Sequence, residues 1–444
     1  MSVIRYPQPM PEFQNAQLKA DVAAIEGIYE DFKEQVSAYG LPFSDVDEAR
    51  AFDAAVSELR AKGVSVANDR KSFHWGFVSP SCIQCRQGLE TVTLALSTQC
   101  PRNCFFCFNP NQKNYEALLH ATADVCAMLE SDHRAGRALT DIALTGGEPL
   151  LHIPETLAFF ERANQLYPAS YTRLYTSGAF LTEEVLQQLM DLNLNEIRFS
   201  VKMDDPAGAK AKLLDLMESS KRYIPHVMVE MPVMPDETEE MKALLRELDA
   251  RGVTGINLLE LCFPLHNAKE FAKRGYAIKR TPFRVLYDYW YAGGLPIAGS
   301  ELACLEVLGW AVDEGLSLGV HYCSLENKLT GQVFQANREQ TWKFAPAAMS
   351  QRDYFLKHAF AYHPESQALM KTFAKKNLRG YSLNEQTGLL AFPVSWIPKL
   401  AKRHPDMQLG ISCNILVERS EGPALRELAV DVTTPAMFDP KTDA

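Results

Sequence analysis

The stretch TVTLALSTQCPRNCFFC, residues 91–107, joins an apolar, β-branched run directly to a loop with three cysteines. Its first part, residues 91–97, predicts a β-strand because β-branched and apolar residues predominate. Cys100, Cys104 and Cys107 follow at once, in the spacing CxxxCxxC. A strand end followed by clustered thiols indicates a place where chemistry or ligand binding is expected.

Five more strand-like runs follow, each separated from the next by a longer helical pattern. The predicted strands are 91–97, 141–147, 172–178, 196–202, 226–233 and 255–261, and the predicted helices are 114–134, 154–166, 182–192, 207–219 and 236–251. Such regular alternation predicts parallel strands with right-handed crossovers. We therefore expect the α/β class, with a partial parallel (β/α)6 barrel whose chemistry lies at the carboxyl ends of its strands.

The segments outside this alternation divide the rest of the chain. Residues 1–80 predict an N-terminal helical cap, with helices over 17–39 and 45–62, and residues 81–262 the barrel core. Residues 263–339 predict an insertion or lid, since they include a long aromatic-rich connection. That segment also has a helix over 299–315 and a late strand over 317–324. Residues 340–444 read as a small α+β domain with a helix near 351–376.

Composition excludes several classes of partner. The net charge of the 444 residues is −10 and the sequence pI is near 5.6, which argues against a nucleic-acid backbone as partner. We see no apolar leader region and no run of about 18 apolar residues, so neither export nor a membrane partner is expected. A cytoplasmic location follows. There, ten cysteines are expected as metal ligands, catalytic thiols or buried side chains rather than disulfides.

Three thiolates without a fourth favour one kind of metal centre. A structural zinc ion usually takes four protein ligands, often in paired CxxC units. Three cysteines instead suit a cubane iron–sulfur cluster, in which one iron stays open for an exogenous ligand. Zinc, or a chance spacing, is the alternative.

Two motifs together resemble the radical SAM superfamily. They are CPRNCFFC, residues 100–107, which has Phe106 before its third cysteine, and LTGGEPLL, residues 144–151, which ends the second strand. The resemblance implies an enzyme with a [4Fe-4S] cluster whose open iron is chelated by S-adenosylmethionine (SAM). One electron, supplied through a flavodoxin- or ferredoxin-type protein, then cleaves SAM to a 5′-deoxyadenosyl radical.

The same resemblance implies which residues hold SAM. Gly146 and Gly147 permit close backbone approach, and the Glu148 carboxylate suits the methionyl ammonium. The residues assigned to SAM binding are Phe106, Gly146, Gly147, Glu148, Ser177, Ser200 and Lys202. Many members have an acid where this chain has Lys202. The alternative for the strand-end residues is that they bond nearby backbone groups.

Further cysteines predict a second centre. Cys82 and Cys85 form a CxxC before the first strand, and Cys323 follows the late strand. We expect these three to hold an auxiliary iron–sulfur cluster, with zinc or a redox dithiol as alternatives. The order of these motifs is similar to that of an uncharacterised branch grouped with pyruvate formate-lyase activating enzymes. The resemblance covers residues 90–262.

The substrate is less well defined by the sequence. An aromatic stretch at 281–291 and the extra C-terminal domain favour a groove for a peptide or protein side chain, although these aromatic residues also suit helix packing. A small biosynthetic intermediate is the second hypothesis. A non-enzymatic iron–sulfur or zinc scaffold is the third, and the GGEP motif argues against it because a scaffold needs no SAM site.

Overall fold

The computed structural model describes residues 12–84, 87–112, 114–281, 294–338 and 344–441. The chain divides into two compact units, each described here by itself. Among the described residues, the first unit comprises 39–280 and 294–328, and the second comprises 12–38, 281 and 329–441. Helix α12 (Leu325–Asn337) contains the division between them.

The first unit is built on a nine-stranded sheet in which seven neighbouring strands are parallel. The hydrogen-bonded order is β1-β2-β11-β8-β7-β6-β5-β4-β3. The strands are β1 (Ser65–Ala67), β2 (Ser72–Trp75), β3 (Thr91–Ala95), β4 (Asp141–Thr145), β5 (Tyr171–Thr176), β6 (Glu196–Phe199), β7 (His226–Val233), β8 (Gly255–Glu260) and β11 (Gly319–Cys323). The six expected strands are confirmed, with sequential parallel pairing. The late strand β11 joins them as a seventh, beside β8.

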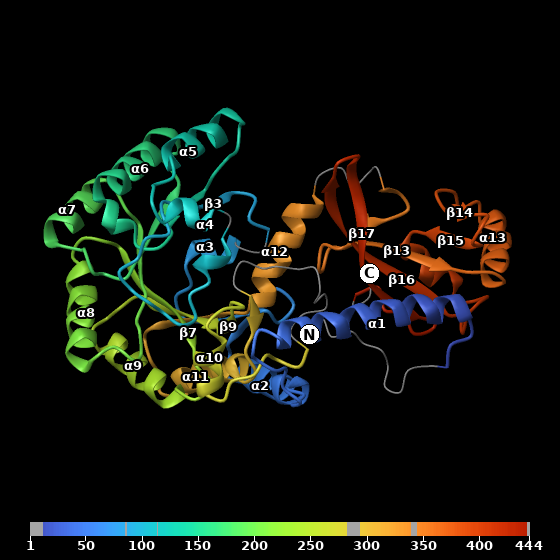
Figure 1. Ribbon diagram of the computed structural model, residues 1–444, viewed down its shortest axis with the longest axis horizontal. Helices are drawn as coiled ribbons and strands as arrows, with labels where there is room; N and C mark the ends of the chain where they lie inside the picture. The colour runs from blue at the N-terminus through green and yellow to red at the C-terminus, as the bar shows by residue number, and fades with distance from the viewer. Residues whose placement is uncertain (1–11, 85–86, 113, 282–293, 339–343, 442–444) are drawn as a thin grey trace. The chain divides into compact units, whose positions relative to one another are not determined.

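Helices connect these strands and lie along the sheet, as Figure 1 shows for α5 to α9. The helices of this unit are α2 (Ala49–Ala61), α3 (Pro80–Gln84), α4 (Tyr115–Leu118), α5 (Val125–Arg134), α6 (Ile153–Leu166), α7 (Glu183–Asp191), α8 (Ala207–Ser220), α9 (Thr238–Ala250), α10 (Ala268–Lys273) and α11 (Ser300–Asp313). Short 3-10 turns, η1 (Asn109–Asn111) and η2 (Pro149–His152), and a small pair of strands, β9 (Cys262–Phe263) and β10 (Leu295–Pro296), complete it. Capping explains some helix starts: Thr182 accepts from the Val185 N–H at the start of α7, which satisfies a donor the helix leaves open.

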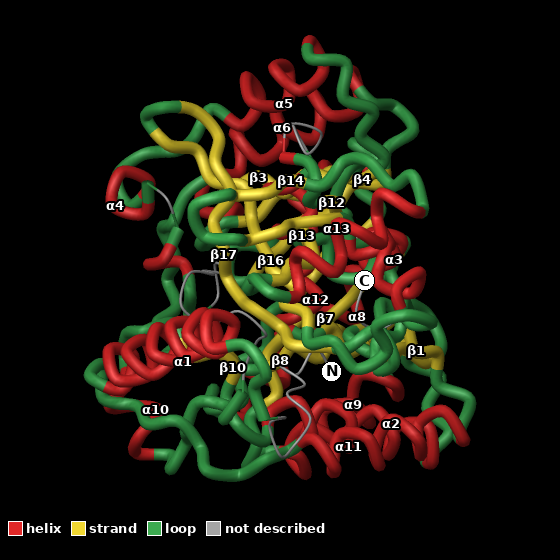
Figure 2. The backbone as a smooth tube through the Cα atoms, turned by 90° about the vertical axis from the view of Figure 1, so that its right-hand side faces the viewer, coloured by secondary structure: helices red, strands yellow, loops and turns green. Residues whose placement is uncertain are grey.

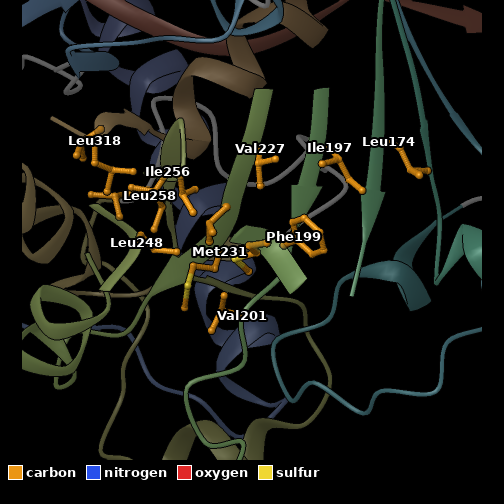
Figure 3. Close-up of a cluster of buried hydrophobic side chains, with 14 of the residues drawn as sticks. Leu174, Ile197, Phe199, Val201, Val227, Met231, Leu248, Ile256, Leu258 and Leu318 are labelled. Carbon is orange, nitrogen blue, oxygen red and sulfur yellow. The ribbon is translucent and has the colours of Figure 1, made fainter. Parts of the chain in front are cut away.

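One face of the parallel sheet is apolar and packs on the helices. Alternate residues of the central strands, among them Ile197, Val227 and Ile256, are fully buried in one cluster. Figure 3 shows these side chains together with Leu248 of α9. Successive strand residues point to opposite faces of a sheet. The apolar face is therefore the side of the sheet that the helices cover.

The opposite face of the same strands is polar, although it is also largely buried. Glu196 and Arg198 on β6 are almost inaccessible to solvent. The Arg198 guanidinium forms ion pairs with two carboxylates, that of Glu196 and that of Glu230 on β7. Asn257 on β8 donates to Glu230 at 2.8 Å, and His321 on β11 contacts Asn257 at 2.9 Å. Buried charges are tolerated only when paired in this way.

The second unit is an antiparallel sheet with helices. Its strands are β12 (Ala348–Met349), β13 (Leu356–Ala361), β14 (Ser382–Asn384), β15 (Leu389–Phe392), β16 (Leu409–Arg419) and β17 (Gly422–Thr433), in the order β14-β15-β13-β16-β17 with β12 on β13. Figure 2 shows β13, β16 and β17 side by side. Helices α1 (Ala16–Ser37) and α13 (Glu365–Lys375) and the 3-10 turn η4 (Val394–Leu400) belong to the same unit. The expected α+β character is confirmed.

Some sequence predictions differ from the structure. The helix expected near 351–376 is only α13, because residues 356–361 form a strand. Pro364 explains this, since a proline disfavours helical backbone in the residue before it. The proposed cap at 1–80 is divided, as α1 groups with the second unit and α2 with the first. Most of the aromatic stretch at 281–291 lies outside the described residues.

Candidate cofactor site

The three-cysteine loop starts at the carboxyl end of β3, where parallel α/β sheets place their chemistry. Cys100 is exposed, and Cys104 and Cys107 are half-buried. A turn closes on the Cys104 carbonyl, which accepts from the Cys107 N–H at 3.1 Å. Burial raises the pKa of Cys104 to about 11, and the neighbouring Cys107 and Cys100 thiols add to the shift. Three thiols crowded in this way need a strong positive centre to be deprotonated together, which a metal cluster supplies.

The glycine motif is joined to this loop through the backbone. The Gly147 N–H donates to Ser97 at 2.7 Å, and the Glu148 N–H donates to Gln99 at 2.7 Å. A Cβ atom on Gly146, whose φ is +136°, would lie 2.2 Å from the Ser97 carbonyl oxygen, and one on Gly147 would lie 2.0 Å from that of Gln99. The two glycines therefore permit a close approach between the GGEP loop and the backbone segment that precedes Cys100.

The Glu148 carboxylate links the ends of two strands. It is completely buried, and Oε1 accepts from the Leu150 N–H at 3.2 Å and the Thr176 hydroxyl at 2.8 Å. Oε2 accepts from the Ser177 N–H at 2.6 Å and from the Ser177 hydroxyl. A carboxylate offers about four acceptor sites, so the protein itself occupies them. The expected contact of Glu148 with the SAM ammonium stays a prediction.

The other predicted SAM-binding residues lie at neighbouring strand ends. Ser200 follows β6 and is exposed, and its N–H donates to the Thr176 carbonyl at 3.1 Å. The Lys202 ammonium lies 3.4 Å from Asp204, and its positive charge acts on the Cys104 thiol. Phe106 is half-buried and meets Phe105 edge to face, with ring centroids 5.2 Å apart. Their roles toward SAM stay predictions.

Several side chains outside the cysteine pattern hold the loop in place. Asn109 donates to the Gly146 carbonyl at 3.0 Å, and Asn111 to that of Pro264 at 2.9 Å. The Arg274 guanidinium lies 4.3 Å from the centre of the Phe105 ring, and Arg102 forms an ion pair with Asp205. Sequence reasoning missed these residues. The two asparagines just after Cys107 were the available signal, because such side chains bond loop backbone.

The predicted auxiliary ligands have other contacts in the described residues. The Cys82 sulfur lies 3.4 Å from Arg198 Nη2 and 3.5 Å from Asn257 Nδ2. Burial raises its pKa, but the charges of Arg198 and His321 outweigh burial and bring the pKa of Cys82 to about 6. Cys323 is buried and accepts from Asn327 Nδ2 at 3.4 Å. Cys85 lies outside the described residues.

Among the residues that the structure describes, no three His, Cys, Asp or Glu side chains converge on one point suited to a metal ion. A four-iron cluster does not require such convergence, because each of its cysteines binds a different iron. The donor set of the loop, three adjacent cysteines at one strand end, fits a cluster of that kind. No described helix is long and apolar enough for a membrane span.

Comparison with known proteins identifies the class. Residues 94–248 match the model of the radical SAM superfamily. A putative glycyl-radical enzyme activating enzyme of Methanocaldococcus jannaschii is 26% identical over 234 residues, which are 51% of this chain and 59% of the relative. A PqqA peptide cyclase of Xanthomonas campestris is 35% identical over 121 residues, or 27% of this chain and 30% of the relative. The chain thus matches at most about three fifths of these relatives' length.

Two solved structures align with about half of the chain. Streptococcus suis SuiB bound to the precursor peptide SuiA gives a TM-score of 0.33 at 10% identity, covering 55% of this chain and 53% of SuiB. Coproporphyrinogen III oxidase of Escherichia coli, a radical SAM enzyme, gives a TM-score of 0.34 at 11% identity. The match covers 54% of this chain and 57% of the oxidase.

Residues 94–248, which contain the three-cysteine loop and the GGEP motif, form a radical SAM superfamily domain. Such a domain implies a [4Fe-4S] cluster and SAM as cofactors, and an enzyme of unassigned reaction. Its similarity to a glycyl-radical enzyme activating enzyme agrees with the branch that the motif order resembles.

Proposed function

We propose that this protein cleaves SAM reductively and uses the product to remove hydrogen from a polypeptide side chain. Cys100, Cys104 and Cys107 would hold a cluster that, when bound, would supply one electron to break the C–S bond of SAM into methionine and a 5′-deoxyadenosyl radical. Hydrogen transfer from the substrate would then give 5′-deoxyadenosine and leave a substrate radical. An external flavodoxin- or ferredoxin-type protein supplies the electron.

The observation that supports this proposal most is the direct backbone junction between the two motifs. The segment that leads into Cys100 and the loop that contains Gly147 and Glu148 share two hydrogen bonds of 2.7 Å at adjacent strand ends. In our proposal Cys100, Cys104 and Cys107 hold the cluster, and the GGEP loop presents SAM to its open iron. The junction would therefore fix the position of SAM on the GGEP loop relative to the cluster on the cysteine loop.

Strand-end side chains complete the proposed SAM site. Lys202 is suited to the methionyl carboxylate because its side chain is partly exposed and its ammonium makes a loose contact of 3.4 Å with Asp204. Ser200 is suited to a ribose hydroxyl because it is exposed. Glu148 and Ser177 bond each other and hold the GGEP loop against β5, and contact of the Glu148 carboxylate with the methionyl ammonium remains part of the proposal.

A polypeptide substrate is supported by the relatives. The names of both curated relatives refer to action on an enzyme or a peptide. We also propose that Cys82, Cys85 and Cys323 hold an auxiliary iron–sulfur centre. The donors on the Cys82 sulfur, Arg198 and Asn257, are of the kind that stabilise a thiolate ligand.

The test is SAM cleavage by anaerobically reconstituted protein reduced with dithionite. We expect 5′-deoxyadenosine from the wild type, none from Cys104→Ser, and wild-type yield from Cys126→Ser, whose cysteine is on α5 outside the site. Equal yields from both variants, or no product from iron-loaded wild type, would refute the proposal. Iron left in a variant without Cys100, Cys104 and Cys107 would support the auxiliary centre, and its complete loss would count against it.

A further inference from the structure

We propose that Arg102 and Asp205 are positioning residues that set the reduction potential of the cluster by opposite charge effects. This inference rests on the proposed function, because it requires a cluster on the three-cysteine loop. It concerns residues that the family motifs do not specify. Arg102 lies between the first two cysteines, and Asp205 lies in the loop between β6 and α8.

The ion pair joins the cysteine loop to the loop between β6 and α8. Arg102 Nη1 donates to Asp205 Oδ2. The Asp205 N–H donates in turn to the Lys202 carbonyl at 3.1 Å, so the acid is fixed within the turn that presents Lys202. The side chains are only 24% and 17% exposed. Solvent therefore screens their charges less than those of a fully exposed pair.

Arg102 lies within the cysteine loop, two residues from Cys100 and two residues from Cys104 in the chain. Reduction adds one negative charge to a cluster, so a nearby cation favours the reduced state and a nearby anion disfavours it. Asp205 partly cancels Arg102. The two residues thus shift the reduction potential in opposite directions.

A purely mechanical role makes a different prediction. If the pair only tied the cysteine loop to the β6–α8 loop, removing either partner would loosen the same contact and change the cluster in the same way. Arg102→Gln and Asp205→Asn each remove one charge and keep a polar side chain of similar length. The sign of the potential shift therefore separates a charge effect from a mechanical one.

The experiment is a redox titration of the reconstituted protein, followed by the electron paramagnetic resonance signal of the reduced cluster. We expect a lower midpoint potential for Arg102→Gln, a higher one for Asp205→Asn, and a value near wild type for the double variant. Arg246→Gln is the matched control. It removes the charge of Arg246 on α9 from an exposed pair with Glu314, which directly follows α11, and we expect no shift of the midpoint potential.

The outcomes separate this inference from the proposed function. A reducible cluster in the wild type with shifts of the same sign in both variants, or with shifts no larger than in Arg246→Gln, overturns the inference alone. Loss of the cluster in both single variants also overturns it, since the pair is then structural. A wild type that binds iron on the loop but shows no reducible cluster overturns both proposals.

Discussion

Replacing Gly147 by alanine tests the backbone junction between the cysteine loop and the GGEP loop. The new Cβ would lie 2.0 Å from the Gln99 oxygen and 2.5 Å from its carbonyl carbon, where ordinary contacts begin at 3.4 Å. Both obstacles are backbone atoms, so no side-chain rotation can relieve the clash. The two loops must separate by more than 1 Å, roughly the gap between these distances.

The cost follows from what that separation breaks. Two backbone hydrogen bonds of 2.7 Å join the loops, and each contributes about 1 kcal/mol. Overpacking of a closely fitted position adds about 1–3 kcal/mol. We therefore expect Gly147→Ala to lower the free energy of unfolding by about 3–5 kcal/mol, a large share of a typical domain's stability, and to reduce iron incorporation.

The assay is urea unfolding of the iron-free protein, together with iron content after anaerobic reconstitution. Gly208→Ala is the matched control, because Gly208 lies in helix α8 and a Cβ added there would meet nothing within 4 Å. That change is expected to stabilise the protein by about 0.5–1 kcal/mol. The reasoning is refuted if Gly147→Ala unfolds at the wild-type urea concentration and takes up the wild-type amount of iron.

Three further changes test other parts of the structure. Glu148→Gln puts an amide where four hydrogen-bond donors converge, so we expect urea unfolding to show a free energy of unfolding lower by about 1–3 kcal/mol. We expect no comparable decrease for Glu161→Gln, because Glu161 is exposed on α6. In iron-free protein, the rate of Cys82 alkylation by iodoacetamide is expected to be half-maximal near pH 6. Cys126, whose pKa is raised by burial, should react only at alkaline pH. Peptide mass spectrometry that found the same pH profile for both cysteines would contradict this. Burial lowers the pKa of His358 to about 4. The unfolded chain therefore binds a proton at His358 near pH 6.5, whereas the folded chain does not. The free energy of unfolding should fall from pH 6.5 toward pH 4, and it should fall less steeply in His358→Gln. Equal slopes in the two proteins would show that His358 does not contribute.

The regular part of the fold was predictable because it is encoded locally. Strands β3 to β8 and most helices between them follow periodic patterns, and parallel pairing follows from their alternation. The one helix expected over 114–134 is instead divided into α4 and α5. The helix predicted near 351–376 failed where Pro364 interrupts it. The grouping of α1 with the second unit could not be predicted, since an amphipathic helix shows which face it buries but not the sheet that covers it.

The buried polar face of the parallel sheet was also hidden from sequence reasoning. Glu196 and Arg198 read as interruptions of an apolar strand, and nothing nearby in the chain neutralises them all. The further partners of Arg198, Glu230 and Cys82, come from β7 and α3, and the Tyr171 hydroxyl that donates to Glu196 comes from β5. Only the register between strands brings these groups within contact distance, and that register depends on the whole sheet.

The sequence alone placed the proposed cluster ligands together, because three cysteines within eight residues of one loop need no tertiary fold to be neighbours. Only the tertiary structure decided what surrounds them. It set Gly147 against Gln99, Glu148 against Ser177, and Arg102 against Asp205. The reason is that parallel pairing aligns the ends of strands that are dozens of residues apart.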